Sequence, residues 1–214
     1  MAWCEERLGW GREEWLRTVW TDESSFSTAG FSHRPWVLRR ADEEYHPDCV
    51  DEIWGSGRKS IMVWGAFCGE LKSPLYVVPP GTTMDSEKYT SNVLDPLLIP
   101  FWHQTCETYG WTRIVEDGAP SHQKYAIRCR RLNDVDTTPW PPQSPDLNLI
   151  EALWADIEVE LGQVYERATN TEDLILMLNT AWGNIAPERL LNLIDSMPAR
   201  LAAVIEAGGN ATPY

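Results

Sequence analysis

Three acidic residues stand where they could converge on divalent metal ions. Asp22 and Asp117 each follow a short strand-like run, and Glu151 lies in the first turn of a helical pattern. Carboxylate oxygens are hard ligands that suit Mg²⁺ or Mn²⁺. Two such ions roughly 3.5–4 Å apart can activate a nucleophile and neutralise the charge that grows on a phosphodiester. Because the chain has 32 acidic residues, this spacing alone is a weak signal.

The elements that would position these carboxylates come as strands, then a strand–helix alternation, then helices. Strands are expected at residues 18–21, 35–39, 60–67, 75–78 and 111–116, and helices at 3–18, from Asp85, at 124–132, from Asn148, at 171–183 and at 187–206. The first strand is expected to end at Asp22, because turn-forming residues follow it. Asp85 is the expected N-cap of its helix. The order predicts one mixed α/β domain with a helical C-terminal end.

Length and composition exclude several classes of protein. A chain of 214 residues that is 43% hydrophobic is globular and forms one domain. No run of 18 apolar residues is present, so no membrane span is expected, and the charged N-terminus argues against secretion. Five cysteines without a CxxC pair indicate free thiols rather than a structural zinc site.

The charge balance is unusual for a protein that acts on nucleic acid. Eighteen basic and 32 acidic residues give a net charge of −14, whereas an unconditional nucleic-acid binder usually has a basic surplus. This acidity and the 12 tryptophans favour, as an alternative, a glycoside hydrolase. That enzyme would need two carboxyl groups facing each other about 5–10 Å apart, and no metal.

Four segments around the three carboxylates carry a more specific signal. They read WTDESSF at 20–26, SIMVWG at 60–65, EDGAPSH at 116–122 and WPPQSPDLNLIEALW at 140–154. Together they resemble the catalytic domain of Tc1/mariner-type transposases, which are DDE superfamily endonucleases. The resemblance covers residues 18–214, including the C-terminal tail. It implies a ribonuclease H-like fold, a mixed central sheet flanked by helices.

The resemblance also implies a site and an activity. By motif match, Asp22, Asp117 and Glu151 are the catalytic triad and hold two Mg²⁺ ions, with Mn²⁺ as a substitute. The activity is DNA cleavage at transposon ends followed by strand transfer, with DNA as the partner. Residues 50–60 are similar to the family's loop that contacts a partner subunit. Localisation would be nuclear, or otherwise cytoplasmic.

The chain departs from the family pattern in three places. Leu149 replaces a usual Pro, and Gly118 stands where many relatives have Asn. Because Met1 is only 21 residues before Asp22, we expect the N-terminal DNA-recognition modules to be absent. Residues 1–17 are then a helical remnant and 18–214 the catalytic domain. DNA binding by this chain alone is expected to be weak and salt-sensitive. The alternative is a catalytically idle remnant that serves as a protein-interaction domain.

Simpler structural roles compete with each proposed ligand. Glu151 fits a capping box with Asn148 as the N-cap. Asp22 could end a strand in a turn, and Asp117 could form an Asx-turn. Glu23 and Glu116, beside the two aspartates, are expected to be solvated neighbours, because adjacent strand residues point to opposite faces.

A group of basic side chains after Asp117 forms the candidate nucleic-acid contact. It comprises His122, Lys124, Arg128, Arg130 and Arg131. Their functional role would be phosphate contact. The alternatives are a structural hydrogen bond for His122 and a solvated helix face for the other four.

Overall fold

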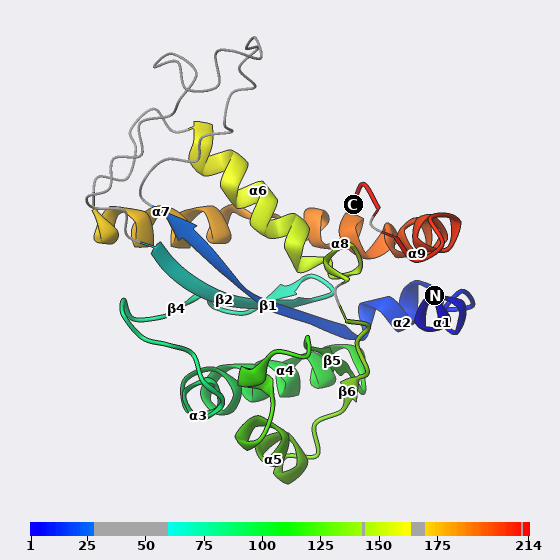
Figure 1. The fold of residues 1–214 in the computed structure, drawn as a ribbon, viewed down its shortest axis with the longest axis horizontal. Coiled ribbons are helices and arrows are strands. Elements are labelled where there is room, and N and C mark those ends of the chain that lie inside the picture. Colours follow the sequence, from blue (N-terminus) through cyan, green and yellow to red (C-terminus); the bar gives the residue numbers. More distant parts are fainter. Residues whose placement is uncertain (28–59, 143, 164–169, 211) are drawn as a thin grey trace, which may run out of the picture.

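A six-stranded mixed sheet lies between two helical layers in the computed structural model (Figure 1). The structure describes residues 1–27, 60–142, 144–163, 170–210 and 212–214. The strands are β1 (Thr18–Ser27), β2 (Ser60–Cys68), β3 (Leu71–Lys72), β4 (Tyr76–Val77), β5 (Arg113–Val115) and β6 (Thr137–Thr138). The helices are α1 (Ala2–Glu5), α2 (Arg12–Leu16), α3 (Ser86–Tyr89), α4 (Ile99–Tyr109), α5 (Tyr125–Leu132), α6 (Ile150–Gln163), α7 (Thr171–Asn184), α8 (Pro187–Asp195) and α9 (Met197–Glu206).

The strand order is β3-β2-β1-β5-β6, and β4 also pairs with β2. β1 is antiparallel to β2 and parallel to β5, which is in turn parallel to β6. The predicted fold class, a ribonuclease H-like mixed sheet flanked by helices with a helical C-terminal end, is confirmed. The pairing places the end of β5 beside Trp20, two residues before Asp22 in β1, which brings Asp22 and Asp117 to one region of the sheet.

The prediction that β1 ends at Asp22 is wrong. The strand continues to Ser27, because residues 20–27 pair in register with residues 67–60 of β2. Asp22 therefore lies within the strand, directly opposite Gly65. Cross-strand pairing with a buried neighbour outweighs the turn preference of the Asp-Glu-Ser-Ser segment. The strand expected at 35–39 lies outside the described residues.

Two hydrophobic cores cover the two faces of the sheet. One joins Trp20, Phe26 and Phe67 to the layer of α6, α7, α8 and α9. The other joins Val19 and Trp64 to the layer of α3, α4 and α5. In Figure 1 these layers lie above and below the sheet. Alternation along β1 thus points Asp22 toward the α6 layer and Glu23 toward the α3–α5 layer.

The predicted N-cap at Asp85 is present in the structure. Asp85 caps α3, since its Oδ1 accepts a hydrogen bond of 2.9 Å from the Lys88 backbone N–H. Between α3 and α4, residues Thr90–Leu98 form a π-helix that contains Pro96. Of the five cysteines, Cys4, Cys68, Cys106 and Cys129 are free, and Cys49 lies outside the described residues. No helix in the described ranges is both long and apolar enough to cross a membrane.

Both ends of the chain pack against the helical layer. α1 contacts α9 and α2 contacts α8. The Arg12 guanidinium of α2 donates to Asp195 at the end of α8 over 2.6 Å, and the rings of Trp15 and Trp20 stack with centroids 6.2 Å apart. Residues 1–17, expected as a remnant, therefore contribute to the core of the domain.

Candidate active site

Asp22 and Glu151 bring their carboxyl groups into hydrogen-bond contact. Asp22 comes from β1 and Glu151 from the first turn of α6, which packs against that strand. Burial, and then the negative charge of Glu151, raises the pKa of Asp22 to about 8. Burial also raises the pKa of Glu151. The pair therefore holds a proton at neutral pH.

The Pro-rich segment that leads into α6 is held from both ends of the chain. The Trp3 indole N–H donates to the Pro139 carbonyl over 2.7 Å. At the other end, the Arg200 guanidinium donates to the Asp146 carbonyl over 2.6 Å, and the Thr212 hydroxyl donates to the Asp146 carboxylate over 2.8 Å. These contacts fix the start of α6 and thus the position of Glu151.

Asp117 lies two residues beyond the end of β5. Its Oδ1 accepts a hydrogen bond of 3.0 Å from the Ala119 backbone N–H, so the expected Asx-turn is present. The same oxygen lies 2.8 Å from His122 Nδ1. The hydrogen bond from His122 lowers the pKa of Asp117, which is an exposed carboxylate.

One pocket of about 360 Å³ joins all three carboxylates. Its wall comprises Asp22, Asp117, Gly118, Ala119, Trp140, Pro141, Pro142, Ser144, Pro145, Asn148 and Glu151. Three segments far apart in the sequence therefore meet at one cavity. Trp64 and Trp154 are core residues, whereas the half-buried Trp140 lines this pocket.

Asn148 does not form the capping box that was considered for Glu151. Its side chain is 6% exposed, and its Oδ1 has no hydrogen-bond partner among the described residues. Its Nδ2 donates to the Thr21 carbonyl over 3.4 Å. A buried oxygen without a partner in the wall of a pocket is suited to a cation or to ordered solvent.

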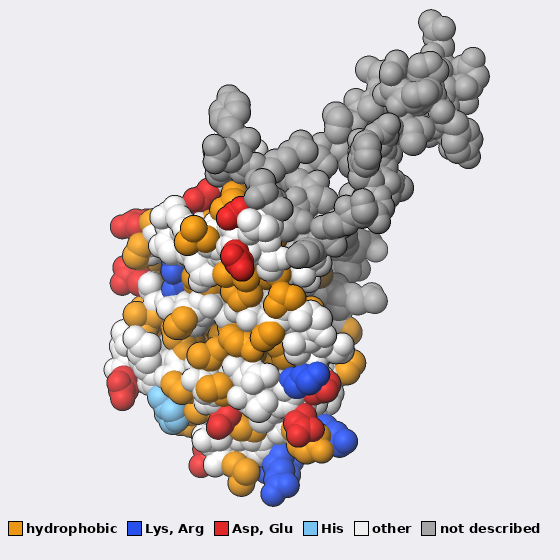
Figure 2. Space-filling view, turned by 90° about the vertical axis from the view of Figure 1, so that its left-hand side faces the viewer, with side chains coloured by type: hydrophobic (Ala, Val, Ile, Leu, Met, Phe, Trp, Pro, Cys, Tyr) orange, Lys and Arg blue, Asp and Glu red, His pale blue; other side chains and the backbone are white. Residues whose placement is uncertain are grey.

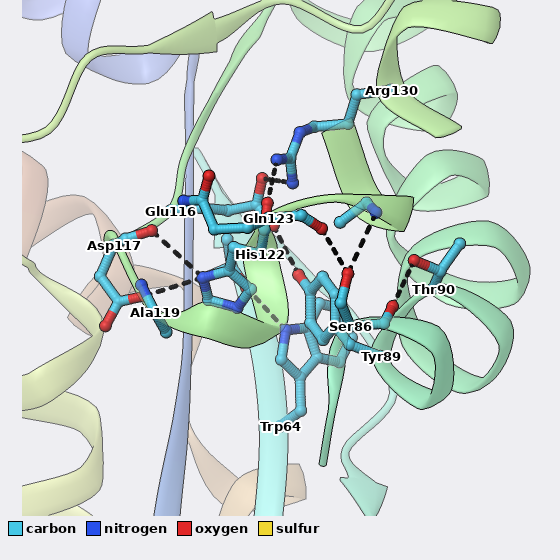
Figure 3. Close-up of polar contacts among 12 residues, drawn as sticks. Trp64, Ser86, Tyr89, Thr90, Glu116, Asp117, Ala119, His122, Gln123 and Arg130 are labelled. Carbon is cyan, nitrogen blue, oxygen red and sulfur yellow. Dashed lines mark hydrogen bonds and ion pairs between the residues drawn. The ribbon is translucent and has the colours of Figure 1, made fainter. Parts of the chain in front are cut away.

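Glu116 and Glu23 are not the solvated neighbours that the sequence suggested. Glu116 is 9% exposed, accepts a hydrogen bond of 2.6 Å from the Tyr89 hydroxyl, and pairs with Arg130 at 2.6 Å. Glu23 lies 3.3 Å from Nε2 of His122. Figure 3 shows the Glu116–Arg130 pair beside His122 and Asp117. Strand alternation correctly placed both glutamates on the face opposite the aspartates. It could not show that Tyr89, Arg130 and His122 lie there to contact them.

His122 is buried between two carboxylates. Burial alone would lower its pKa, but the hydrogen bonds to Asp117 and Glu23 prevail and raise the pKa to about 10. Its ring is therefore an imidazolium at neutral pH. With 4% of its surface exposed and both ring nitrogens engaged, His122 is not free to contact a phosphate in this state.

The other basic candidates differ in exposure. Lys124, Arg128 and Arg131 are exposed on and beside α5, whereas Arg130 pairs with Glu116. Most Lys and Arg side chains visible in Figure 2 gather at the lower end of that face, the end that holds α3 to α5 in Figure 1. This end is therefore the more cationic part of an acidic molecule.

The side chains around the pocket offer oxygen donors to a divalent cation. Within the described part of the chain, no three His, Cys, Asp or Glu side chains are close enough to hold one ion as they stand. Nevertheless the pocket offers three carboxyl groups and the free Oδ1 of Asn148, and two of the carboxyls share a proton that a cation could replace. All are hard oxygen donors, so the residues fit Mg²⁺ or Mn²⁺.

Comparison with known proteins decides the family. A family model described as DDE superfamily endonuclease matches residues 17–175. The chain belongs to this family. It is 36% identical to the Tc1 transposase of Caenorhabditis elegans and 34% identical to the Tcb1 transposase of Caenorhabditis briggsae, in each case over all of this chain and 76% of the relative. It is an enzyme of the DDE transposase type, and the resemblance drawn from its motifs is confirmed.

Solved structures support the fold of this family. The catalytic domain of Mos1 mariner transposase superposes with a TM-score of 0.71 at 18% identity, covering 98% of this chain and 91% of that domain. A pre-cleavage Mos1 transpososome gives a TM-score of 0.78 at 18% identity, covering 98% of this chain and 61% of the Mos1 chain. The mixed sheet flanked by helices is therefore the family's ribonuclease H-like fold.

Proposed function

We propose that this chain cleaves DNA and transfers strands with divalent cations held by Asp22, Asp117 and Glu151. The observation that carries the proposal is their convergence from β1, the end of β5 and the start of α6 onto one pocket. Burial, and then the negative charge of Glu151, raises the pKa of Asp22 to about 8. Such an arrangement disfavours the metal-free, fully ionised state and so favours a bound cation.

Each side chain has a distinct task in the proposed reaction. Asp22 and Glu151 give up their shared proton and bind as carboxylates, while Asp117 offers the oxygen that His122 does not hold. Asn148 adds a neutral oxygen at the wall. When bound, two Mg²⁺ ions, or Mn²⁺ as a substitute, supply activation of the attacking water or 3′-hydroxyl and stabilisation of the leaving oxygen.

DNA is the proposed substrate and partner. The relatives are named as transposases, and the Mos1 structures include a paired-end complex with a left transposon end and catalytic domains with Mn or Mg. With a net charge of −14, this chain alone should bind DNA weakly and in a strongly salt-dependent way. Nuclear localisation follows from such a substrate. A partner subunit is proposed to bind at residues 50–60, of which 50–59 lie outside the described residues.

The glycoside hydrolase alternative finds no support in the site. A glycosidase needs a gap of about 5–10 Å between its two carboxyl groups for the sugar bond. Asp22 and Glu151 instead share a hydrogen bond. The alternative of a catalytically idle remnant also finds no support, since all three carboxylates line the pocket.

A Mn²⁺ titration followed by thermal unfolding tests the proposal. A cation at 100 times its Kd stabilises the folded chain by about 2.7 kcal/mol, which is roughly 5–10 °C for a chain of this size. Asp117→Asn and Glu151→Gln should lose this gain. Glu158→Gln, an exposed carboxylate on the same helix as Glu151, should keep it. A gain that survives in both site variants would refute the proposal.

A further inference from the structure

The two carboxylate oxygens of Asp117 have different surroundings. Oδ1 receives the Ala119 backbone N–H at 3.0 Å and lies 2.8 Å from His122 Nδ1, which also lies 3.2 Å from the Asp117 backbone carbonyl oxygen. Oδ2 has no hydrogen-bond partner among the described residues, and 52% of the side chain is exposed. Because Asp117 lines the pocket with Asp22 and Glu151, the fixed Oδ1 determines that Oδ2 is the oxygen left for a ligand.

His122 is itself held in place on several sides. Its Nε2 lies 3.3 Å from Glu23 Oε1, which comes from β1. Its ring lies against that of Tyr89, with centroids 4.5 Å apart. Its backbone carbonyl accepts a hydrogen bond from Arg130 over 2.5 Å. The imidazole therefore has little freedom to rotate away from Asp117 (Figure 3).

A second layer of contacts fixes the residues around His122. The Arg130 guanidinium donates to Glu116 Oε2 over 2.6 Å, while the Tyr89 hydroxyl donates to Glu116 Oε1 over 2.6 Å. These groups come from α5, the end of β5 and α3. The network thus connects α3 and α5 to the Asp117 carboxylate through His122.

We propose that His122 is a positioning residue of the active site, which clamps Oδ1 of Asp117 and thereby presents Oδ2 to the divalent cation. Glu23 and the Glu116–Arg130–Tyr89 network hold His122 for this task. The proposal rests on the proposed function, in which Asp117 is a cation ligand. Outer contacts that orient a metal ligand are typically worth 10- to 100-fold in metal affinity.

Three substitutions of His122 in the full 214-residue chain separate this role from simple packing. His122→Ala removes the clamp. His122→Asn can place its amide nitrogen near the position of Nδ1 and so keep the bond to Asp117, whereas His122→Gln reaches only the position of Nε2. His103→Asn, an exposed histidine on α4, is the matched control.

Two midpoints are measured. The first is the Mn²⁺ concentration at half of the thermal-stability gain, and the second is the Mn²⁺ concentration at half of the maximal rate of nicking of a supercoiled plasmid. We expect His122→Ala and His122→Gln to raise both midpoints by about tenfold or more. His122→Asn should recover most of this loss, and His103→Asn should match the parent chain. A residue that only packs would lower the melting temperature and leave the midpoints unchanged.

Equal midpoints in the parent chain and His122→Ala would overturn the positioning role. Should His122→Ala fail to fold, equal midpoints for His122→Asn and His122→Gln would overturn it as well. Asp117→Asn separates the two proposals. If Asp117→Asn and Glu151→Gln both retain the Mn²⁺ gain, the proposed function itself fails; if both lose the gain while all His122 variants keep the midpoint of the parent chain, only the positioning role fails.

Discussion

Asp22 of β1 and Glu151 of α6 place their carboxyl groups in hydrogen-bond contact across the strand–helix interface. In a metal-free chain this contact is a source of instability, because two buried carboxyls cannot both ionise at low cost. The same contact prepares the pocket for a cation, which can replace the proton and attract both groups. The contact therefore lowers the stability of the metal-free protein and favours cation binding.

Asp22→Asn should stabilise the metal-free protein at high pH. The folded chain keeps the Asp22 proton up to about pH 8, whereas the unfolded chain releases it near the ordinary aspartate pKa of 3.8. The folded state therefore loses stability as the pH rises from about 4 to 8, and Asn removes this loss. We expect a gain on the order of 5 kcal/mol at pH 8 that vanishes near pH 4.

Urea unfolding in EDTA at pH 4, 6 and 8 measures this gain, with Glu158→Gln as the control. A gain that is the same at all three pH values would show that the carboxyl pair does not share a proton.

Gly65→Ala should damage both stability and activity. A Cβ at this position would lie 2.9 Å from the Trp182 ring and 3.0 Å from the Trp154 ring. Gly65 lies opposite Asp22 in the sheet, and Trp154 follows Glu151 on α6. Overpacking of this kind typically costs about 1–3 kcal/mol, and here it would also shift the helix that carries Glu151.

Gly183→Ala is the matched control for that substitution. Gly183 lies in α7 with nothing within 4 Å of the added Cβ, so the change should be neutral or gain up to about 1 kcal/mol. Chemical unfolding and plasmid nicking check both variants. A fully active Gly65→Ala chain would contradict the close packing behind the site.

Arg130→Met should lower the free energy of unfolding far more than a substitution on a surface helix usually does. It leaves the Glu116 carboxylate, whose side chain is 5% exposed, without its ionic partner. Breaking such a buried pair costs roughly 3–5 kcal/mol, and replacing both members restores much of it. In a double-mutant cycle measured by urea unfolding, Glu116→Gln with Arg130→Met should therefore be more stable than Arg130→Met alone. Strict additivity of the two single changes would rule out the coupling.

The exposed cations of α5 should account for part of any DNA affinity. The slope of log K against log salt is negative, and each phosphate contact that is lost reduces its magnitude by about 0.9. The triple variant Lys124→Ala, Arg128→Ala, Arg131→Ala should reduce that slope by roughly 2–3. Arg189→Ala, which removes a cation paired with Asp156, serves as the control. Filter binding between 50 and 200 mM salt measures the slopes. Identical slopes for the triple variant and the parent chain would show that DNA does not contact these side chains.

The sequence predicted most elements and the three carboxylates because their signals are local. The runs at 60–67 and 111–116 have strand composition, and Asp85 is an N-cap that needs only its own helix. The motif around Glu151 fixed its place in the first turn of α6.

What the sequence could not show depends on partners far away in the chain. β1 extends past Asp22 only because β2 supplies the other half of its ladder. Glu116 is buried because Tyr89 and Arg130 satisfy it. The unpaired oxygen of Asn148, where a capping box was considered, likewise became visible only in three dimensions.

Anomalous diffraction from crystals of the chain soaked in Mn²⁺ tests the central claim most directly. We predict manganese peaks bound by the carboxylates of Asp22, Asp117 and Glu151, and no such peaks after the same soak of Asp22→Asn crystals. A pocket that contains no manganese, with the Asp22–Glu151 hydrogen bond still intact at saturating Mn²⁺, would contradict the account.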